Sequence, residues 1–292
     1  VWKIDGVVCN VGKDLRTAGV AARMAGLPVV HRVGLPRDMR DTLKVRLTHR
    51  FVRPALLSPC EFIKREMLAE VSFLTPDEIT VIRTGKPCAD EPPALRQEAD
   101  AGPRRLVVTS QLNADKGHAD LFRALASLAN EGLDFHLDVV GEGSAQGELH
   151  ALAETLGLQE RLTFHGFAAT VRPFLRSAEA FVLPSRSEGL PNTLLEAMAE
   201  GLAPVARAVG GVGEVWPGEL GALLAVPGPG EDDLVAPLRR LLSASPGELH
   251  AWRLAAWNAC RENFEITVQA ARLAAWLQNL TARNADRETA TS

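Results

Sequence analysis

The sequence lacks the features of several classes of protein. No run of about 18 or more uncharged apolar residues occurs, so no stretch reads as a membrane-spanning helix. The first residues, Val1 to Asp5, lack the order of basic and then apolar residues that marks a signal peptide. The four cysteines are Cys9, Cys60, Cys88 and Cys260. Because they form no CxxC pair, they indicate neither a zinc site nor a disulfide framework. We expect a cytoplasmic protein with buried or inert thiols.

Length and composition are those of an ordinary globular protein. The chain has 292 residues, of which 46% are apolar and 23% are charged. This length is sufficient for two α/β domains, each with its own buried core. Disordered and fibrous classes are excluded by the same composition.

Charge is distributed unevenly along the chain. The net charge is −4, but residues 1–86 hold 15 Lys and Arg against 9 Asp and Glu, a net of +6, which leaves −10 for residues 87–292. Six cations near residue 45, nearly all of them expected in one helix, face only Asp38 and Asp41: Arg37, Arg40, Lys44, Arg46, Arg50 and Arg53. They form either a solvated helix face or a surface for anionic lipid headgroups or an anionic acceptor. Nucleic acid is not expected as a partner, because no aromatic residues interleave with these charges.

Expected strands and helices alternate along the first part of the chain, which is the pattern of a parallel sheet covered by helices. The expected strands are 4–9, 28–33, 55–57 and 80–82, with a helix at 14–25. The proline-rich and acidic segment from Lys86 to Pro93 cannot continue a sheet and indicates an interdomain connection. We therefore assign 1–90 to a partial N-terminal domain and 91–103 to a linker.

The alternation restarts beyond Arg105 and predicts a nucleotide-binding domain over 104–265. The expected strands are 106–109, 135–140, 161–164, 180–183 and 203–206, and the expected helices are 118–131, 146–156, 171–177 and 193–200. A helical stretch from Gly247 to Leu280 has bulky apolar residues at Trp252, Trp257 and Trp276, for which core packing is a better explanation than membrane contact. We assign 266–292 to a C-terminal helix with a polar, frayed tail from Thr281.

One segment, Ser185 to Ala199, concentrates the chemical signal. A strand is expected to end at Pro184, and a glycine-containing loop leads to a helix that begins near Thr193. Backbone N–H groups and the positive end of such a helix suit a diphosphate. Glu188 in the loop can accept hydrogen bonds from sugar hydroxyls, and Glu196 can reach ribose hydroxyls. Alternatively, Thr193 and Glu196 form a capping box and have only a structural role.

This segment resembles the E-x7-E motif of the retaining glycosyltransferase family 4, which has the GT-B fold of two facing Rossmann-like domains with parallel sheets. The resemblance implies that Glu188 contacts the donor sugar and Glu196 the ribose. The resemblance also implies that neighbouring residues of the motif bind the donor: Gly189, Leu190, Asn192 and Thr193.

Further segments are similar to landmarks of the same family, and the similarity covers about residues 1–280. Leu112 to His118 is similar to a strand-to-helix loop in which a lysine, here Lys116, neutralises the donor diphosphate. The stretch from Leu162 to Gly166, with Thr163, is similar to the one whose backbone pairs with the base. The segments 140–143 and 209–215 match two more landmarks.

The chain departs from the family pattern in two ways. Gln111 stands where family members usually carry an arginine, and a neutral amide cannot make the same charge-assisted bond to a diphosphate. The first strand and glycine-rich loop of the family are not matched, so we expect an incomplete N-terminal domain and a sequence that is a fragment. His31 lies near the position of a family histidine on the acceptor side, although a lone histidine is more often structural.

The resemblance implies a retaining transferase that moves a sugar from a nucleoside diphosphate sugar to an acceptor hydroxyl, without a metal or another cofactor. The acceptor would be a lipopolysaccharide, glycolipid or other glycan precursor, and the protein would be cytoplasmic with possible peripheral contact to an anionic membrane. The residues implied in catalysis are Lys116, Glu188 and His31. Two alternatives are a nucleotide-sugar epimerase of the same overall fold and a non-catalytic nucleotide-sugar-binding subunit.

Overall fold

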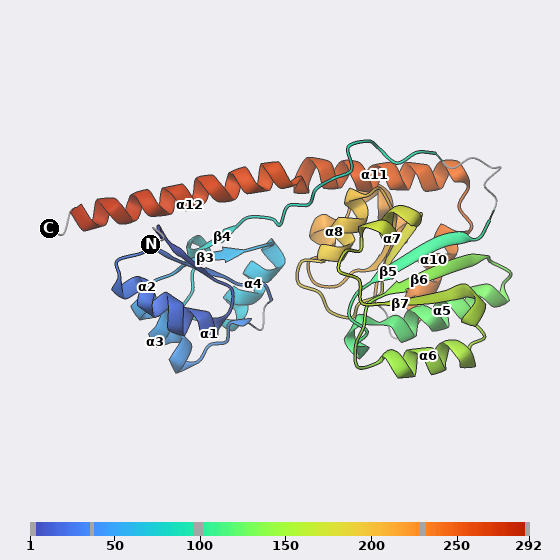
Figure 1. The fold of residues 1–292 in the computed structure, drawn as a ribbon, viewed down its shortest axis with the longest axis horizontal. Coiled ribbons are helices and arrows are strands. Elements are labelled where there is room, and N and C mark those ends of the chain that lie inside the picture. Colours follow the sequence, from blue (N-terminus) through green and yellow to red (C-terminus); the bar gives the residue numbers. More distant parts are fainter. Residues whose placement is uncertain (1–3, 36–37, 96–101, 228–231, 290–292) are drawn as a thin grey trace. The chain divides into compact units, whose positions relative to one another are not determined.

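The computed structural model describes residues 4–35, 38–95, 102–227 and 232–289 (Figure 1). The chain divides into two compact units. The first unit combines Val1–Gly85 with Ile266–Ser292, and the second is Lys86–Glu265. Each unit contains one parallel sheet, as the alternation of strands and helices predicts.

The first unit is built on a parallel sheet in the order β1-β2-β3-β4. Its strands are β1 (Val7–Cys9), β2 (Val29–Arg32), β3 (Ala55–Ser58) and β4 (Ile79–Val81). Between β1 and β2 the helix consists of α1 (Gly12–Asp14), a π-helical stretch (Leu15–Gly19) and α2 (Val20–Met24). Helices α3 (Leu43–Val52) and α4 (Glu61–Glu70) follow β2 and β3. The core forms where β1 and β2 meet these helices: Cys9, Leu15, Ala22, Val29 and Val52.

The basic segment is less helical than the sequence suggests. Helix α3 begins after Thr42, whose side chain accepts a hydrogen bond from the Val45 N–H, and it ends at Arg53, which has a φ of 51°. Three of the six cations lie within the helix, whereas Arg40 precedes it and Arg37 lies outside the described residues. The expectation that nearly all of them share one helix was therefore wrong, because the capping threonine starts the helix late.

The C-terminal helical stretch consists of two helices, which divide at the boundary expected between residues 265 and 266. Helix α11 (Pro246–Phe264) begins with a capping box of Ser245 and Glu248, and the chain leaves helical geometry at Glu265. Helix α12 (Ile266–Thr289) then joins the first unit, and it continues beyond residue 281, where the sequence predicted a frayed tail. Its Leu277 and Leu280 line a small pocket with strand β1. Within the described part of the chain, no helix is long and apolar enough to cross a membrane.

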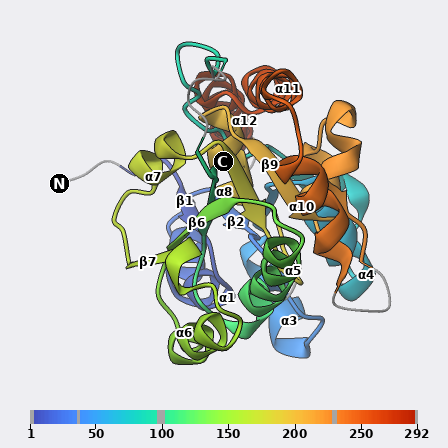
Figure 2. The same ribbon diagram turned by 90° about the vertical axis from the view of Figure 1, so that its right-hand side faces the viewer.

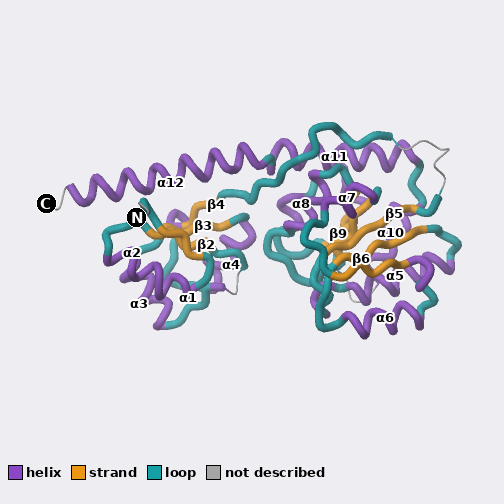
Figure 3. The backbone as a smooth tube through the Cα atoms, in the orientation of Figure 1, coloured by secondary structure: helices purple, strands orange, loops and turns teal. Residues whose placement is uncertain are grey.

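The second unit is a doubly wound sheet of six parallel strands in the order β10-β9-β8-β5-β6-β7. Figures 2 and 3 show this sheet among the helices of the unit. The strands are β5 (Arg104–Thr109), β6 (Phe135–Val140), β7 (Leu162–Gly166), β8 (Ala180–Leu183), β9 (Ala203–Arg207) and β10 (Leu224–Ala225). The chain winds from β5 to β7 in one direction and from β8 to β10 in the other. The order therefore reverses between β5 and β8, which defines a topological switch point.

Helices cover both faces of this sheet (Figure 1). One face carries α5 (His118–Asn130), α6 (Gln146–Thr155) and α10 (Val235–Leu242). The other carries α7 (Arg172–Ser177), α8 (Asn192–Ala199) and α11, and a short helix α9 (Val212–Val215) follows β9. Because both faces are covered, central strand β8 is buried throughout its length. Phe122, Phe135 and Phe181 are among the largest fully buried side chains.

Candidate functional site

The loops after β5 and β8 lie side by side at the switch point of the second unit. In an open parallel α/β sheet, ligands bind in the crevice beyond the carboxyl ends of the strands at such a point. The first loop carries Lys116 and the second carries Glu188. Lys116 Nζ donates a hydrogen bond of 2.8 Å to Glu188 Oε1. Two residues 72 positions apart in sequence, both candidates for donor binding, are thus in direct contact.

The close approach of these loops depends on Gly117. This residue has a φ of +70°, and a Cβ placed on it would lie 2.0 Å from the carbonyl oxygen of Pro184. A side chain is therefore excluded both by the backbone conformation and by the space. The Arg186 N–H also donates to the Asp115 carbonyl at 2.9 Å, which joins the two loops on the other side of the lysine.

A third loop, after β9, supports the segment that carries Glu188. Gly210 has a φ of +57°, and a Cβ there would lie 1.7 Å from the Glu188 carbonyl oxygen. The Gly211 N–H donates to the Gly189 carbonyl at 2.9 Å. The position of Glu188 is thus set by backbone contacts from the loops on either side of it, which suits a group that must hold a fixed orientation.

Helix α8 begins just beyond Glu188, and its first turn has no side-chain cap. The N-cap residue is Pro191, and neither Thr193 nor Glu196 forms a capping box. The capping-box alternative was therefore wrong. The amide groups of the first turn remain available to an anion, and the positive end of the helix dipole favours one. Glu196 instead accepts a hydrogen bond of 2.6 Å from Lys86 Nζ.

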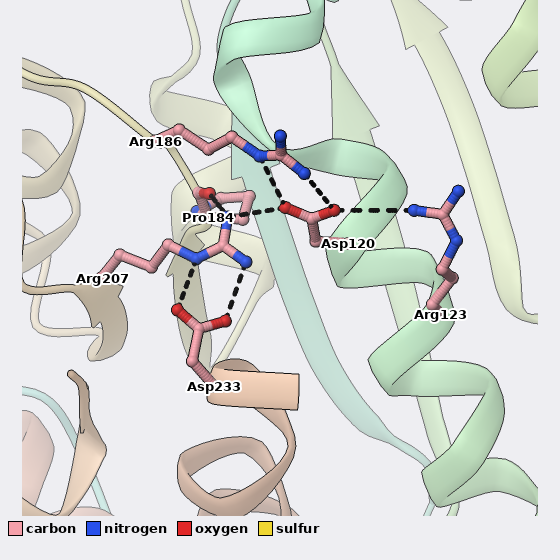
Figure 4. Close-up of polar contacts among 6 residues, drawn as sticks. All are labelled: Asp120, Arg123, Pro184, Arg186, Arg207 and Asp233. Carbon is pink, nitrogen blue, oxygen red and sulfur yellow. Dashed lines mark hydrogen bonds and ion pairs between the residues drawn. The ribbon is translucent and has the colours of Figure 1, made fainter. Parts of the chain in front are cut away.

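A buried ionic network lies beside the two loops (Figure 4). The Asp120 side chain, 1% exposed, accepts hydrogen bonds from Arg207 at 2.8 Å and from Arg186 at 2.8 and 3.0 Å. Arg207 also donates twice to Asp233 and once to the Pro184 carbonyl. Arg123 approaches Asp120 at 3.5 Å.

Two opposing effects act on the pKa of Asp120. Burial raises the pKa, but hydrogen bonds from Arg186 and Arg207 outweigh that effect and leave the pKa below its usual value. Asp120 therefore stays ionised and holds together Arg186, of the loop after β8, and Arg207, at the end of β9. No pattern in the sequence predicted this network. The only local signal was a charged residue, Arg207, at the end of the apolar strand β9.

Other residues singled out in the sequence lie outside the contact between Lys116 and Glu188. Gln111 is exposed, and its side-chain oxygen accepts a hydrogen bond of 3.3 Å from the side-chain amide of Asn113. Thr163 lies within β7, and its hydroxyl bonds to His136 at 2.9 Å. Of the remaining motif residues, Leu190 is buried, Asn192 is exposed and Thr193 is half-buried.

His31 lies in the interior of the first unit. It is 1% exposed, and its ring centroid is 5.3 Å from that of His49. Burial lowers the pKa of His31 to about 4, although the nearby Asp38 opposes this shift. The ring is therefore neutral near pH 7. Its burial favours a structural role, and contact with an acceptor stays a prediction.

The described residues include no group of three or more His, Cys, Asp or Glu side chains placed to hold a metal ion. The metal-independent reaction stays a prediction.

The two parallel sheets and the switch-point site define an α/β protein of the GT-B class. Anabaena HepE has this fold, and its structure in complex with UDP and glucose matches 94% of the chain and 78% of HepE, with a TM-score of 0.77 and 20% identity. The sucrose-phosphate synthase of Thermosynechococcus elongatus matches 96% of the chain and 74% of the synthase, with a TM-score of 0.77 and 18% identity. At these identities the likeness concerns the fold.

Residues 103–244 match the family model of glycosyl transferases group 1. The lipopolysaccharide core biosynthesis glycosyltransferase LpsD of Rhizobium meliloti is 31% identical over 56% of the chain and 47% of LpsD. The 2-deoxystreptamine glucosyltransferase of Streptomyces kanamyceticus is 34% identical over 39% of the chain and 30% of that enzyme. The chain is thus similar to glycosyl transferases group 1, and it spans about half or less of the length of these relatives.

Proposed function

We propose that the chain belongs to an enzyme that transfers a sugar from a nucleoside diphosphate sugar to an acceptor hydroxyl, with retention at the anomeric carbon. The observation that carries this proposal is the contact between Lys116 and Glu188 at the switch point, next to the uncapped first turn of α8. The cation and the backbone N–H groups there suit a diphosphate, and the anion suits the hydroxyls of a sugar.

In this proposal the groups of the site bind three parts of the nucleotide sugar, namely the diphosphate, the sugar and the ribose. Lys116 and the first-turn amides of α8 bind the diphosphate and stabilise the charge that develops on it as the glycosidic bond breaks. Glu188 accepts hydrogen bonds from sugar hydroxyls, and Glu196 accepts one from the ribose. The acceptor oxygen attacks from the face that the phosphate leaves, and its proton passes to the departing phosphate oxygen. A nucleotide-sugar epimerase is less well supported, since His118 is buried and His31 lies in the core of the other unit.

Titration calorimetry of the chain with UDP, GDP and ADP tests this site. We expect one of these nucleotides to bind, and Lys116→Ala to weaken that binding by about 1.5–3 kcal/mol, the range for a hydrogen bond to a charged group. Lys44→Ala, which removes an exposed lysine of α3, serves as the control. Equal affinities in wild type and Lys116→Ala would refute the assignment of Lys116 to the diphosphate. Binding without transfer or hydrolysis of a nucleotide sugar would favour the non-catalytic alternative.

We further propose that the acceptor is a glycan or glycolipid precursor and that α3 contacts an anionic membrane surface. The relative LpsD acts in lipopolysaccharide core biosynthesis. Helix α3 exposes an apolar stripe at Leu43, Leu47 and Phe51, which are 73%, 58% and 52% exposed. The exposed cations Lys44 and Arg50 lie on the same helix. A helix with basic and apolar residues on its exposed side can lie in the headgroup region of a bilayer.

Sedimentation with lipid vesicles tests this surface. Cations near an anionic surface contribute about 1 kcal/mol each, so we expect the chain to sediment with anionic but not with neutral vesicles at low salt. Arg50→Glu together with Leu47→Ser should abolish sedimentation and leave the fold intact, because exposed groups contribute little to stability. If the wild-type chain ignores anionic vesicles at low salt, α3 is a solvated helix and a soluble acceptor is the better hypothesis.

A further inference from the structure

Lys86 is the first residue of the second unit, and its side chain reaches Glu196 of α8. The two side chains form an ion pair with 2.6 Å between Lys86 Nζ and Glu196 Oε1. The lysine side chain is 12% exposed and the glutamate side chain 35% exposed. The Lys86 backbone is held at the end of α11, where its N–H donates to the Phe264 carbonyl at 2.7 Å.

The residues that follow Lys86 are also held in place. The Ala89 N–H donates to the Ala199 carbonyl at the end of α8, at 2.8 Å. The Ala89 carbonyl accepts from the Trp257 indole of α11 at 3.2 Å. Lys86 therefore extends from a backbone segment that is fixed to both α8 and α11, so its ammonium group approaches Glu196 from a defined direction.

The Glu196 carboxylate keeps one oxygen for another partner. Lys86 occupies Oε1, and no other hydrogen bond to this carboxylate forms within the described part of the chain. A carboxylate with one oxygen held by a cation has a restricted rotation about its last bond, so the second oxygen points in a fixed direction. Because this hydrogen-bond acceptor is already fixed in direction, less entropy is lost when a hydroxyl binds to it.

We propose that Lys86 is a positioning residue, which orients Glu196 so that its free oxygen accepts a hydrogen bond from a ribose hydroxyl of the nucleotide. This inference rests on the proposed function, in which Glu196 faces the ribose. A role in stability alone is a poorer explanation, because the carboxylate is about a third exposed and such pairs contribute little to folding.

The experiment compares nucleotide binding with and without ribose hydroxyls. The nucleoside diphosphate that wild type binds best among UDP, GDP and ADP is titrated alongside its 2′-deoxy and 3′-deoxy analogues. We expect wild type to prefer the full nucleotide over one analogue by about ten- to a hundredfold, the equivalent of a hydrogen bond to a charged group. Lys86→Met and Glu196→Gln should each reduce this preference to near unity. The double variant should show no further loss, because the two residues act on one contact.

Two more variants separate positioning from folding. Lys86→Arg should restore part of the preference, since arginine also donates to a carboxylate, and Lys64→Met on α4 is the control with an unrelated lysine. Urea midpoints of all variants should stay close to that of wild type. If Lys86→Met keeps the preference for the full nucleotide over its deoxy analogue while Glu196→Gln loses it, the positioning role is refuted and the proposed function stands. If wild type binds no nucleoside diphosphate, both proposals fail.

Discussion

Replacement of Arg207 by methionine should destabilise the second unit more than any exposed substitution in it. The Arg207 side chain is 6% exposed and makes hydrogen bonds of 2.7 to 2.8 Å to Asp233, Asp120 and the Pro184 carbonyl. Arg207→Met removes the guanidinium and leaves Asp233, 6% exposed, as a buried carboxylate that has lost this arginine, whereas Asp120, 1% exposed, keeps Arg186. Removal of one partner from a buried ionic network costs about 3–5 kcal/mol, because the remaining charge stays out of water.

A matched control is the pair of Arg239 and Glu131, in which the side chains are 45% and 40% exposed. Arg239→Met removes an arginine with comparable hydrogen bonds, at 2.6 and 2.8 Å, but at an exposed site the expected loss is about 0–1 kcal/mol. Because the chain has two units, stability is best measured locally, by native-state hydrogen exchange of peptides from β8 and β9. Equal losses in the two variants would contradict the argument from burial.

A partial rescue provides a second check on the same reasoning. Arg207→Met combined with Asp233→Asn should recover part of the lost stability, because the added substitution removes a buried charge that has lost its partner. If the stability lost in the double variant equals the sum of the losses in Arg207→Met and Asp233→Asn, the two residues do not act as one network.

Three further predictions concern the site and the first unit. Glu188→Gln should lower sugar transfer strongly while the affinity for the free nucleoside diphosphate, measured by calorimetry, stays nearly unchanged, because that nucleotide lacks the sugar; equal losses in both would contradict the assignment. Gly117→Ala should lower nucleotide affinity and thermal stability together, since its Cβ would meet the Pro184 carbonyl at 2.0 Å; normal binding in this variant would show that the loops can separate. Burial lowers the pKa of both His31 and His49 to about 4, against about 6.5 in an unfolded chain, so the first unit should keep its full stability above pH 6.5 and lose it as pH falls toward 4. Hydrogen exchange of β2 and α3 as a function of pH measures this loss, and a flat profile between pH 6.5 and 4 would refute it.

Most of the second unit could be predicted from the sequence because its signals are local. Strands β6 and β8 have the expected bounds, Phe135–Val140 and Ala180–Leu183. Strand β8 is a short apolar run, and β6 begins with alternating apolar and polar residues, which is the pattern of a strand. The loop that carries Glu188 was expected from a strand, a glycine and a helix start in immediate succession. Helix α4 was not anticipated, since its glutamates and lysine obscure the few apolar residues that it buries, Ile63 and Met67.

The contacts of the site were less predictable, because they join distant parts of the chain. Lys86 and Glu196 are separated by 110 residues, and no local pattern around Lys86 indicates its partner. The sequence also left two interpretations of Thr193 and Glu196, a capping box or contact with the donor. The helix start at Asn192, after Pro191 at the N-cap, excludes the capping box, and the donor contact stays a prediction. The arginine network was missed for a related reason: the burial of Arg207 depends on Asp120 and Asp233, from helix α5 and from the turn before α10.

The return of α12 to the first unit affects how that unit can fold during synthesis. Residues 86–265 leave the ribosome after the strands of the first sheet but before α12, so the sheet lacks this helix until the whole second unit has been made. A nascent first unit therefore exposes apolar residues of β1 that later line a pocket with Leu277 and Leu280. For the same reason, a single cut after Gly85 does not release a complete first unit. Its isolation requires a covalent connection from residue 85 to residue 266, whose neighbouring backbones already lie in contact.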